Sequence, residues 1–256
     1  MTSKERILVA YRRGKPDRVP IMPELWFLVP AKLTGKPFNN LGIPIWKAQL
    51  NAYQHFGCDA WIVPGYSIPE SSEYKTEIHQ KSLSDGSIEV ETLYKTTKGD
   101  LKQRRILPED DAEWMKEHPV KDIFRDLPAY EDVCFSSDIS KIDITEIEDA
   151  IETTGEKGVV EAQVGGSFIA FLAYCREGGY TQAIYDLMDH PDYFEKIYAK
   201  YREHVIKVTE IILRKTKVDA ILAGCESLSL ASPQLVRKWD IPILKEISKV
   251  VKKYNS

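Results

Sequence analysis

The side chains best suited to chemistry lie in four short segments, each of which follows an apolar run in this 256-residue chain. The segments are Pro23–Trp26, Pro64–Tyr66, Gln163–Ser167 and Gly224–Ser227. They carry the carboxylates of Glu24 and Glu226, the phenol of Tyr66, the amide of Gln163 and the hydroxyl of Ser167, together with a thiol. Such a set of hydrogen-bonding groups suits a polar organic ligand. We therefore predict that Glu24, Tyr66, Gln163 and Ser167 bind a small-molecule substrate.

The apolar runs before these segments predict the strands that would position them. Residues 18–24, 59–64, 158–164 and 219–223 are short and apolar, and helical periodicity separates several of them. Strands that alternate with helices are typical of a parallel sheet in an α/β fold. In such folds ligands bind beyond the carboxyl ends of the strands, which is where the four segments fall.

Residues 70–140 interrupt this pattern. The stretches 74–83, 87–97 and 100–107 are rich in Thr, Tyr, Ile and Val, and turn signals at Asp85-Gly86 and Lys98-Gly99 separate them. We predict a three-stranded antiparallel meander here, followed by a surface excursion with short helices. The whole chain, residues 1–256, is then one domain with residues 70–140 inserted within it.

Composition excludes several classes of protein. Thirty-five basic and 39 acidic residues give a net charge of −4, which argues against nucleic acid or an anionic membrane as the main partner. No apolar run approaches the roughly 18 residues of a membrane span. The four cysteines lie far apart without a C-x-x-C pair, as expected of reduced thiols, so we predict a cytoplasmic protein. Nucleotide-binding, serine-hydrolase and zinc-protease motifs are absent from the sequence.

Several segments resemble the uroporphyrinogen decarboxylase superfamily. The opening, Glu5–Leu8 with Gly14–Pro20, is similar to the start of that family. Further similar segments follow in order: Tyr94–Leu101, Tyr174–Gly179, Asp186–Pro191, Ser232-Pro233 and Trp239–Pro242. Together they cover nearly the whole chain. The resemblance implies a TIM-type (β/α)8 barrel, of which this chain holds the N-terminal part, about four β–α units.

Departures from the family separate its branches. The decarboxylases carry R-Q-A-G-R after the first strand and F-S-D after the second, whereas this chain reads Pro23–Leu28 and Pro64–Ser67 there. Of the decarboxylase active-site positions, Tyr174 alone matches. The Y-x-T-x-x-G pattern at Tyr94–Gly99 is similar to the corrinoid-dependent methyltransferases. The leading hypothesis is methyl transfer between a methylated corrinoid protein and a thiol or related acceptor, with Tyr174 and Glu226 as catalytic residues.

The resemblance also implies zinc and a corrinoid protein as partners, although we assign no metal ligand in this chain. The methyltransferases bind zinc through a His-x-Cys motif and a later cysteine, all downstream of the segment that matches Ser232-Pro233, and no His-x-Cys occurs here. The chain is then expected to be a truncated methyltransferase or a natural half-barrel.

Two alternatives stay open. One is a uroporphyrinogen decarboxylase-like decarboxylase in porphyrin metabolism. The other is a non-catalytic half-barrel that serves binding or assembly. Four strands cannot close a barrel, so their open edges lead us to expect a homodimer.

Overall fold

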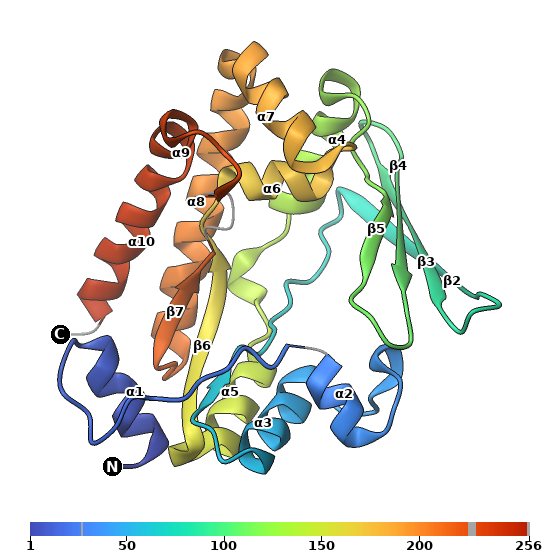
Figure 1. Cartoon of the computed structure of the whole chain (residues 1–256). Coiled ribbons are helices and arrows are strands. Elements are labelled where there is room, and N and C mark those ends of the chain that lie inside the picture. Colours follow the sequence, from blue (N-terminus) through green and yellow to red (C-terminus); the bar gives the residue numbers. More distant parts are fainter. Residues whose placement is uncertain (27, 225–228, 255–256) are drawn as a thin grey trace.

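The computed structural model describes residues 1–26, 28–224 and 229–254, and it contains two separate sheets in a mixed α/β arrangement (Figure 1). The first sheet is parallel and has the strand order β1-β6-β7. Its strands are β1 (Ala60–Ile62), β6 (Gly158–Gly165) and β7 (Ala220–Ala223). The predicted runs at 59–64, 158–164 and 219–223 are therefore strands of one parallel sheet.

Helices cover one face of this sheet: the alternate β6 residues Val160, Ala162 and Val164, which share a face, all pack among helix residues. The helices are α1 (Ser3–Tyr11), α2 (Leu28–Thr34), α3 (Ile45–His55), α4 (Ile123–Phe135), α5 (Thr145–Thr154), α6 (Phe168–Cys175), α7 (Gly179–Asp189), α8 (Pro191–Lys215), α9 (Pro233–Trp239) and α10 (Ile241–Tyr254). Short 3₁₀ turns occur at Phe38–Asn40, Ile139–Lys141 and Gly155–Lys157. Helices α8 and α10 pack against β6 and β7, whereas α3 and α5 pack against β1 and β6 (Figure 1).

The largest apolar core lies between β6 and the helices α6, α8, α9 and α10. Phe168, at the start of α6, is fully buried and contacts the rings of Tyr198, Tyr201 and Trp239. Helix α8 supplies this core through residues three or four positions apart, which share one face of a helix. A smaller core lies between α3 and β1. The candidate site lies where the first core meets the carboxyl end of β6.

The predicted first strand, residues 18–24, is not a strand. The segment runs beside the start of β1: Asp59 N–H donates to the Ile21 carbonyl at 2.9 Å, and Tyr53 donates its hydroxyl to the Pro23 carbonyl at 2.7 Å. Pro20 and Pro23 have no N–H to donate, so a regular ladder cannot continue through them. The described residues therefore hold three parallel strands, and the expected four β–α units were wrong by one.

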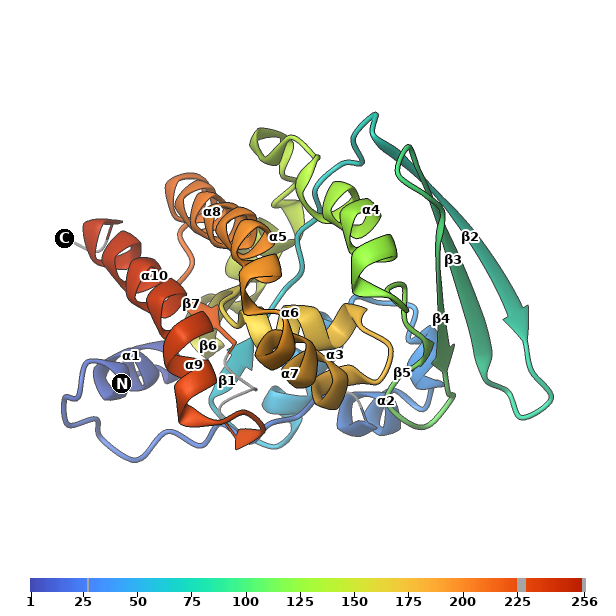
Figure 2. The ribbon, with the colours of Figure 1, turned by 90° about the horizontal axis from the view of Figure 1, so that it is seen from above.

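The second sheet is antiparallel and has the order β2-β3-β4-β5. Its strands are β2 (Tyr74–Ser82), β3 (Ile88–Thr96), β4 (Leu101–Leu107) and β5 (Trp114–Glu117). The first three are the predicted meander, and β5 makes it four-stranded rather than three-stranded. Figure 2 shows this sheet at one side of the molecule, apart from β1, β6 and β7. In sequence it lies, with α4, between β1 and β6.

The additional strand β5 has four residues, of which Trp114 and Met115 are apolar and adjacent, so it shows no alternating pattern from which it could be predicted. It pairs with β4 through Trp114 opposite Ile106, and the carboxylate of Glu117 accepts from Arg104 Nε at 2.6 Å. A cross-strand ion pair of this kind stabilises the strand without adding an alternating apolar pattern to its sequence.

No helix among the described residues is both long enough and apolar enough to cross a membrane.

Candidate functional site

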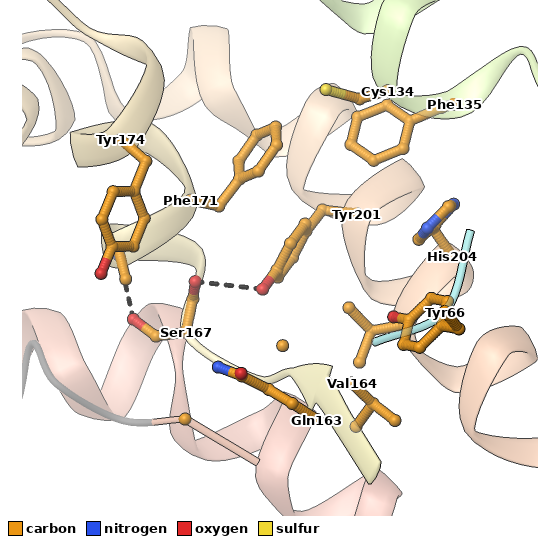
Figure 3. A pocket seen from close by; sticks show the side chains of 14 residues that line it. Tyr66, Cys134, Phe135, Gln163, Val164, Ser167, Phe171, Tyr174, Tyr201 and His204 are labelled. Atoms are coloured by element: carbon orange, nitrogen blue, oxygen red, sulfur yellow. Dashed lines mark hydrogen bonds between the residues drawn. The ribbon is translucent and has the colours of Figure 1, made fainter. Parts of the chain in front are cut away.

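A cavity of about 350 Å³ opens at the carboxyl end of β6 (Figure 3). Strand β6, helices α4, α6 and α8, and the segments that follow β1 and β7 all contribute to its walls. The lining residues are Tyr66, Cys134, Phe135, Gln163, Val164, Gly165, Ser167, Ala170, Phe171, Tyr174, Tyr201, His204, Val205 and Gly224. The position beyond the carboxyl ends of parallel strands is the one predicted from the sequence.

The lining contains aromatic and neutral polar groups. Among the described residues, neither an acidic nor a lysine or arginine side chain lines this cavity. Its polar groups are three phenols, one amide, one hydroxyl, one imidazole and one thiol. A mostly apolar pocket with a few neutral hydrogen-bonding groups suits a small uncharged organic molecule.

The turn from β6 into α6 fixes the floor of the cavity. Gly165 and Gly166 have φ angles of 89° and 130°, and a Cβ on Gly166 would lie 3.1 Å from the Gly224 carbonyl oxygen. Such backbone favours glycine because other residues rarely adopt it. Ser167 then caps α6, since its hydroxyl oxygen accepts from Ala170 N–H at 3.0 Å.

Asp240, fully buried between α9 and α10, holds this helix start in place. Its carboxylate accepts from the Ser167 hydroxyl at 2.9 Å and from the backbone N–H groups of Phe168 and Ile169 at 2.9 and 3.3 Å. A carboxylate at a helix N-terminus satisfies unpaired N–H groups and favours the helix dipole. Ser167 was predicted to bind substrate; it does line the cavity, but its hydroxyl is already committed to the structure.

Tyr201 of α8 ties the same turn to the opposite wall (Figure 3). Its hydroxyl accepts from Gly166 N–H and donates to the Ser167 carbonyl, each at 3.1 Å. Its ring lies 4.8 Å from that of Phe171 between centroids. Burial raises the pKa of Tyr201 to about 12, so the phenol is neutral at physiological pH.

Tyr66 reaches the cavity from the segment after β1. The next residue, Ser67, exchanges backbone hydrogen bonds with Asp143 at 3.2 and 2.8 Å, and these fix the direction of the segment. Burial raises the pKa of Tyr66, which keeps this phenol neutral as well. Tyr66 and Gln163, both predicted as substrate-binding residues, therefore lie in the same cavity.

The predicted catalytic residues have different outcomes. Tyr174 is at the rim of the cavity, with 57% of its surface exposed. Glu226 lies outside the described residues.

Glu24 is not in this cavity. It lines a neighbouring space of about 100 Å³ beside α3. The position of Glu24 follows from the proline-rich segment that runs beside β1 instead of continuing as a strand. Gln163 lines both this space and the main cavity, so the two spaces are neighbours.

Sequence reasoning missed the contribution of α4 and α8. His204 follows Tyr201 by three positions on α8, and residues at this spacing share one helix face. His204 and Cys134 line the cavity, and the His204 ring contacts Phe135 edge-on at 5.5 Å between centroids. The spacing on α8 was a usable signal, whereas nothing in the sequence shows that α4 reaches β6.

The described residues do not fit the zinc site that the resemblance implies. No group of three or more His, Cys, Asp or Glu side chains among them is arranged to hold a metal ion. Burial raises the pKa of the Cys134 thiol to about 12 and also raises that of Cys175, so neither provides a thiolate at neutral pH. In comparisons with known proteins, no family model, curated protein or solved structure matches this chain.

Proposed function

We propose that this protein binds a small uncharged organic molecule in the cavity at the end of β6. Following the resemblance of its sequence, we further propose that it is a corrinoid-dependent methyltransferase of the uroporphyrinogen decarboxylase superfamily. On this proposal the parallel sheet is part of a TIM-type barrel. The bound molecule is then the donor or acceptor of a methyl group, with a corrinoid protein as the partner.

The observation that carries the proposal is the neutral lining of the cavity. Tyr66, Gln163, Ser167 and Tyr174 were chosen as site residues from the sequence, and all four line one space. The described part of that lining offers a polycarboxylate no cation to pair with. Burying a neutral polar group without a hydrogen-bond partner costs on the order of 2–7 kcal/mol of free energy, and burying an unpaired carboxylate costs more. This favours methyl transfer over decarboxylation of a porphyrinogen.

The chemistry that we assign to the described residues is binding and orientation. The phenol of Tyr66 and the amide of Gln163 can each donate and accept a hydrogen bond, so they orient a neutral polar group of the ligand. The rings of Phe171 and Tyr201 contact its apolar part. Zinc would supply a thiolate nucleophile at neutral pH. Because the described residues do not fit zinc, no methyl-transfer step is placed on them.

Calorimetric titration with a matched pair of probes tests this proposal. We expect 4-ethylphenol to bind at least about tenfold more tightly than 4-ethylbenzoate, because the second probe carries a carboxylate. Ala170→Phe places a ring inside the cavity and should abolish binding of 4-ethylphenol, while Gln163→Leu keeps the volume and should weaken it less. Equal binding of the two probes, or unchanged binding in a folded Ala170→Phe protein, would contradict the proposal.

A non-catalytic role in assembly is a second candidate, and one observation favours it. Within the described residues the parallel sheet ends at β1 on one side and at β7 on the other, and β7 pairs with β6 alone. An open sheet edge is a template for pairing with another chain. We propose a homodimer on this basis.

A further inference from the structure

The antiparallel sheet has an open edge at β2. This strand is first in the order β2-β3-β4-β5 and pairs with β3 alone. Figure 2 shows it as the outermost strand of that sheet. It has nine residues, whereas β1 and β7, at the edges of the parallel sheet, have three and four. Among the described residues β2 is therefore the longest strand edge open to pairing with a second chain.

Alternate residues of β2 direct their backbone groups away from β3. Thr76 N–H donates to the Glu70 carboxylate at 3.4 Å, whereas Leu83 N–H donates to the Ser87 carbonyl at 2.8 Å across the hairpin. Because this direction alternates along an antiparallel strand, the even-numbered residues of β2 face the open side. They are Tyr74, Thr76, Ile78, Gln80 and Ser82. Glu70 already binds the N–H of Thr76, so the open stretch begins after that residue.

Two charged side chains on this stretch have no ion-pair partner among the described residues. Glu77 and Lys81 are both exposed. Lys81 lies opposite Glu89 of β3, but the Glu89 carboxylate already accepts from Lys116 Nζ at 2.8 Å. Ile78 lies between the two charges with 60% of its surface exposed. An apolar side chain and two unpaired charges of opposite sign thus lie on one open edge.

A second copy of this chain pairs both charges when the two β2 strands lie antiparallel about a two-fold axis at His79. Glu77 then lies opposite Lys81 of the second copy, and by symmetry Lys81 lies opposite Glu77, which stabilises the strand pair. Ile78 and Gln80 exchange backbone hydrogen bonds with Gln80 and Ile78 of that copy. His79 meets its own copy on an exposed face of the sheet, where a substitution is tolerated.

The outward direction of the even-numbered residues requires the axis to pass through a residue, and most other axes near the middle of β2 are unfavourable. An axis at Lys75, Glu77 or Lys81 places that residue opposite itself. An axis at Ile78 places Lys75 opposite Lys81. Like charges directly opposite each other destabilise a strand pair.

The two remaining axes fail for other reasons. An axis at Thr76 needs the N–H group that Glu70 already binds. An axis at Gln80 places Glu77 opposite the apolar Leu83. Of these axes, only the one at His79 places Glu77 opposite Lys81.

We propose that β2 is the contact surface of the homodimer, paired with β2 of a second copy about His79 so that the antiparallel sheet continues across both chains. The partner is thus a second copy of this chain, recognised by charge pairing along a strand edge. This inference rests on the homodimer of the proposed function, and it assigns that dimer to an edge of the antiparallel sheet.

Disulfide cross-linking tests the position of the axis. Directly opposite residues that share no hydrogen bond lie about 4.5 Å apart between Cα atoms, within the range that a disulfide spans. We expect His79→Cys to cross-link two chains under mild oxidation at least about tenfold faster than Gln80→Cys, which is also exposed but lies farther from its own copy. The wild-type chain, which contains four other cysteines, gives the background. Equal rates for the two variants would contradict the axis.

Mixing of charge-reversed chains tests the pairing itself. Glu77→Lys places a lysine opposite Lys81 of the second copy, and Lys81→Glu places a glutamate opposite Glu77. Each variant alone should therefore raise the dissociation constant of the dimer at least about tenfold, measured by sedimentation equilibrium. An equimolar mixture of the two variants should dimerise again, because every lysine at these positions then faces a glutamate.

The mixture isolates the contact between chains, since the charges within each chain are the same alone and in the mixture. If the single variants dimerise as the wild type does, or if the mixture stays monomeric, the inference is overturned. The cross-linking test changes neither charge of the pair, so it decides the question even if a charge-reversed variant fails to fold.

The outcomes also separate this surface from the homodimer. If the wild-type chain is a dimer and neither test shows contact between β2 strands, the assignment to β2 is wrong while the homodimer stands. If the wild-type chain is a monomer, both are wrong. Binding of an uncharged molecule in the main cavity is tested independently by the phenol probe.

Discussion

Asp240 helps to fix the turn that forms the floor of the cavity, although Asp240 itself does not line the cavity. Its carboxylate accepts one hydroxyl and two backbone N–H groups at the start of α6, and it is fully buried. Asp240→Ala would leave these donors without this acceptor. We expect a loss of about 3 kcal/mol in the free energy of unfolding, measured by urea denaturation.

The matched control for this prediction is Asp240→Asn, which keeps one acceptor oxygen and nearly the same shape. It should lose less stability than Asp240→Ala. If the alanine variant is as stable as the wild type, Asp240 does not hold the turn.

His204 should make stability depend on pH. Burial, and next the charge of Lys207, lowers the pKa of His204 below its ordinary value of about 6.5. The folded chain then binds this proton more weakly than the unfolded chain does. Its contribution to stability is complete above about pH 6.5 and is lost as the pH falls through the lower folded value. We expect the free energy of unfolding to fall between pH 6.5 and pH 5.

His204→Gln should flatten this pH dependence, which urea denaturation at several pH values would measure. His79→Gln is the control, because His79 is exposed on β2. An unchanged slope in His204→Gln would show that another group causes the dependence.

At the scale of residues, the sequence predicted much of the site. Tyr66, Gln163 and Ser167 lie in segments that follow strands, and the strand-end rule predicted that they lie close together. Tyr174 lies on α6 and was chosen from the family resemblance, not from that rule. Glu24 was misplaced because it depended on a strand that two prolines prevent. His204 was missed because its role depends on how α8 packs against β6, which a single sequence does not reveal.

At the scale of elements, a buried ion cluster attaches the N-terminal segment to the start of β1. Asp59 is fully buried and accepts from Arg6 Nη1 at 2.6 Å, from Arg18 Nη1 at 2.8 Å and from Ile21 N–H at 2.9 Å. Burial acts to raise the pKa of Asp59, but its hydrogen-bond donors outweigh this and lower it. The carboxylate is therefore ionised at neutral pH, and it replaces the ladder that Pro20 cannot form.

Asp59→Ala should cost about 3 kcal/mol of unfolding free energy, because it leaves a buried arginine without one of its partners. Asp17→Ala provides the comparison. Asp17 also binds Arg6, at 2.6 Å, but 42% of its side chain is exposed, so its loss should cost much less. Chemical denaturation of both variants measures the difference, and equal losses would argue against the cluster as an anchor.

The elements themselves were predicted with uneven success, for identifiable reasons. The turn at Asp85-Gly86 was predicted correctly, since Gly86 has a φ of 83° and Ser87 N–H donates to Asp85 Oδ1 at 3.0 Å. Strand β5 was not predicted, because it is stabilised by pairing with β4 rather than by its own pattern. Local signals such as turns and helix ends are visible in a sequence, whereas edge strands depend on their neighbours.

At the scale of the whole molecule, the open parallel sheet leads to a prediction about assembly. We expect the protein to be a dimer in solution, with about twice the chain mass of 29.3 kDa by sedimentation equilibrium. Pairing of exposed strand edges is the physical reason. A mass equal to one chain at micromolar concentration would contradict the homodimer and with it the assembly role.

The central claim is that an uncharged organic molecule binds at the carboxyl end of β6. The most direct measurement is the set of intermolecular nuclear Overhauser effects between 4-ethylphenol and the isotope-labelled protein. We predict contacts from the probe to the side chains of Phe171 and Tyr201, whose rings lie side by side in the lining of the cavity. Contacts confined to residues outside the cavity, or no contacts at a saturating concentration of the probe, would contradict the claim.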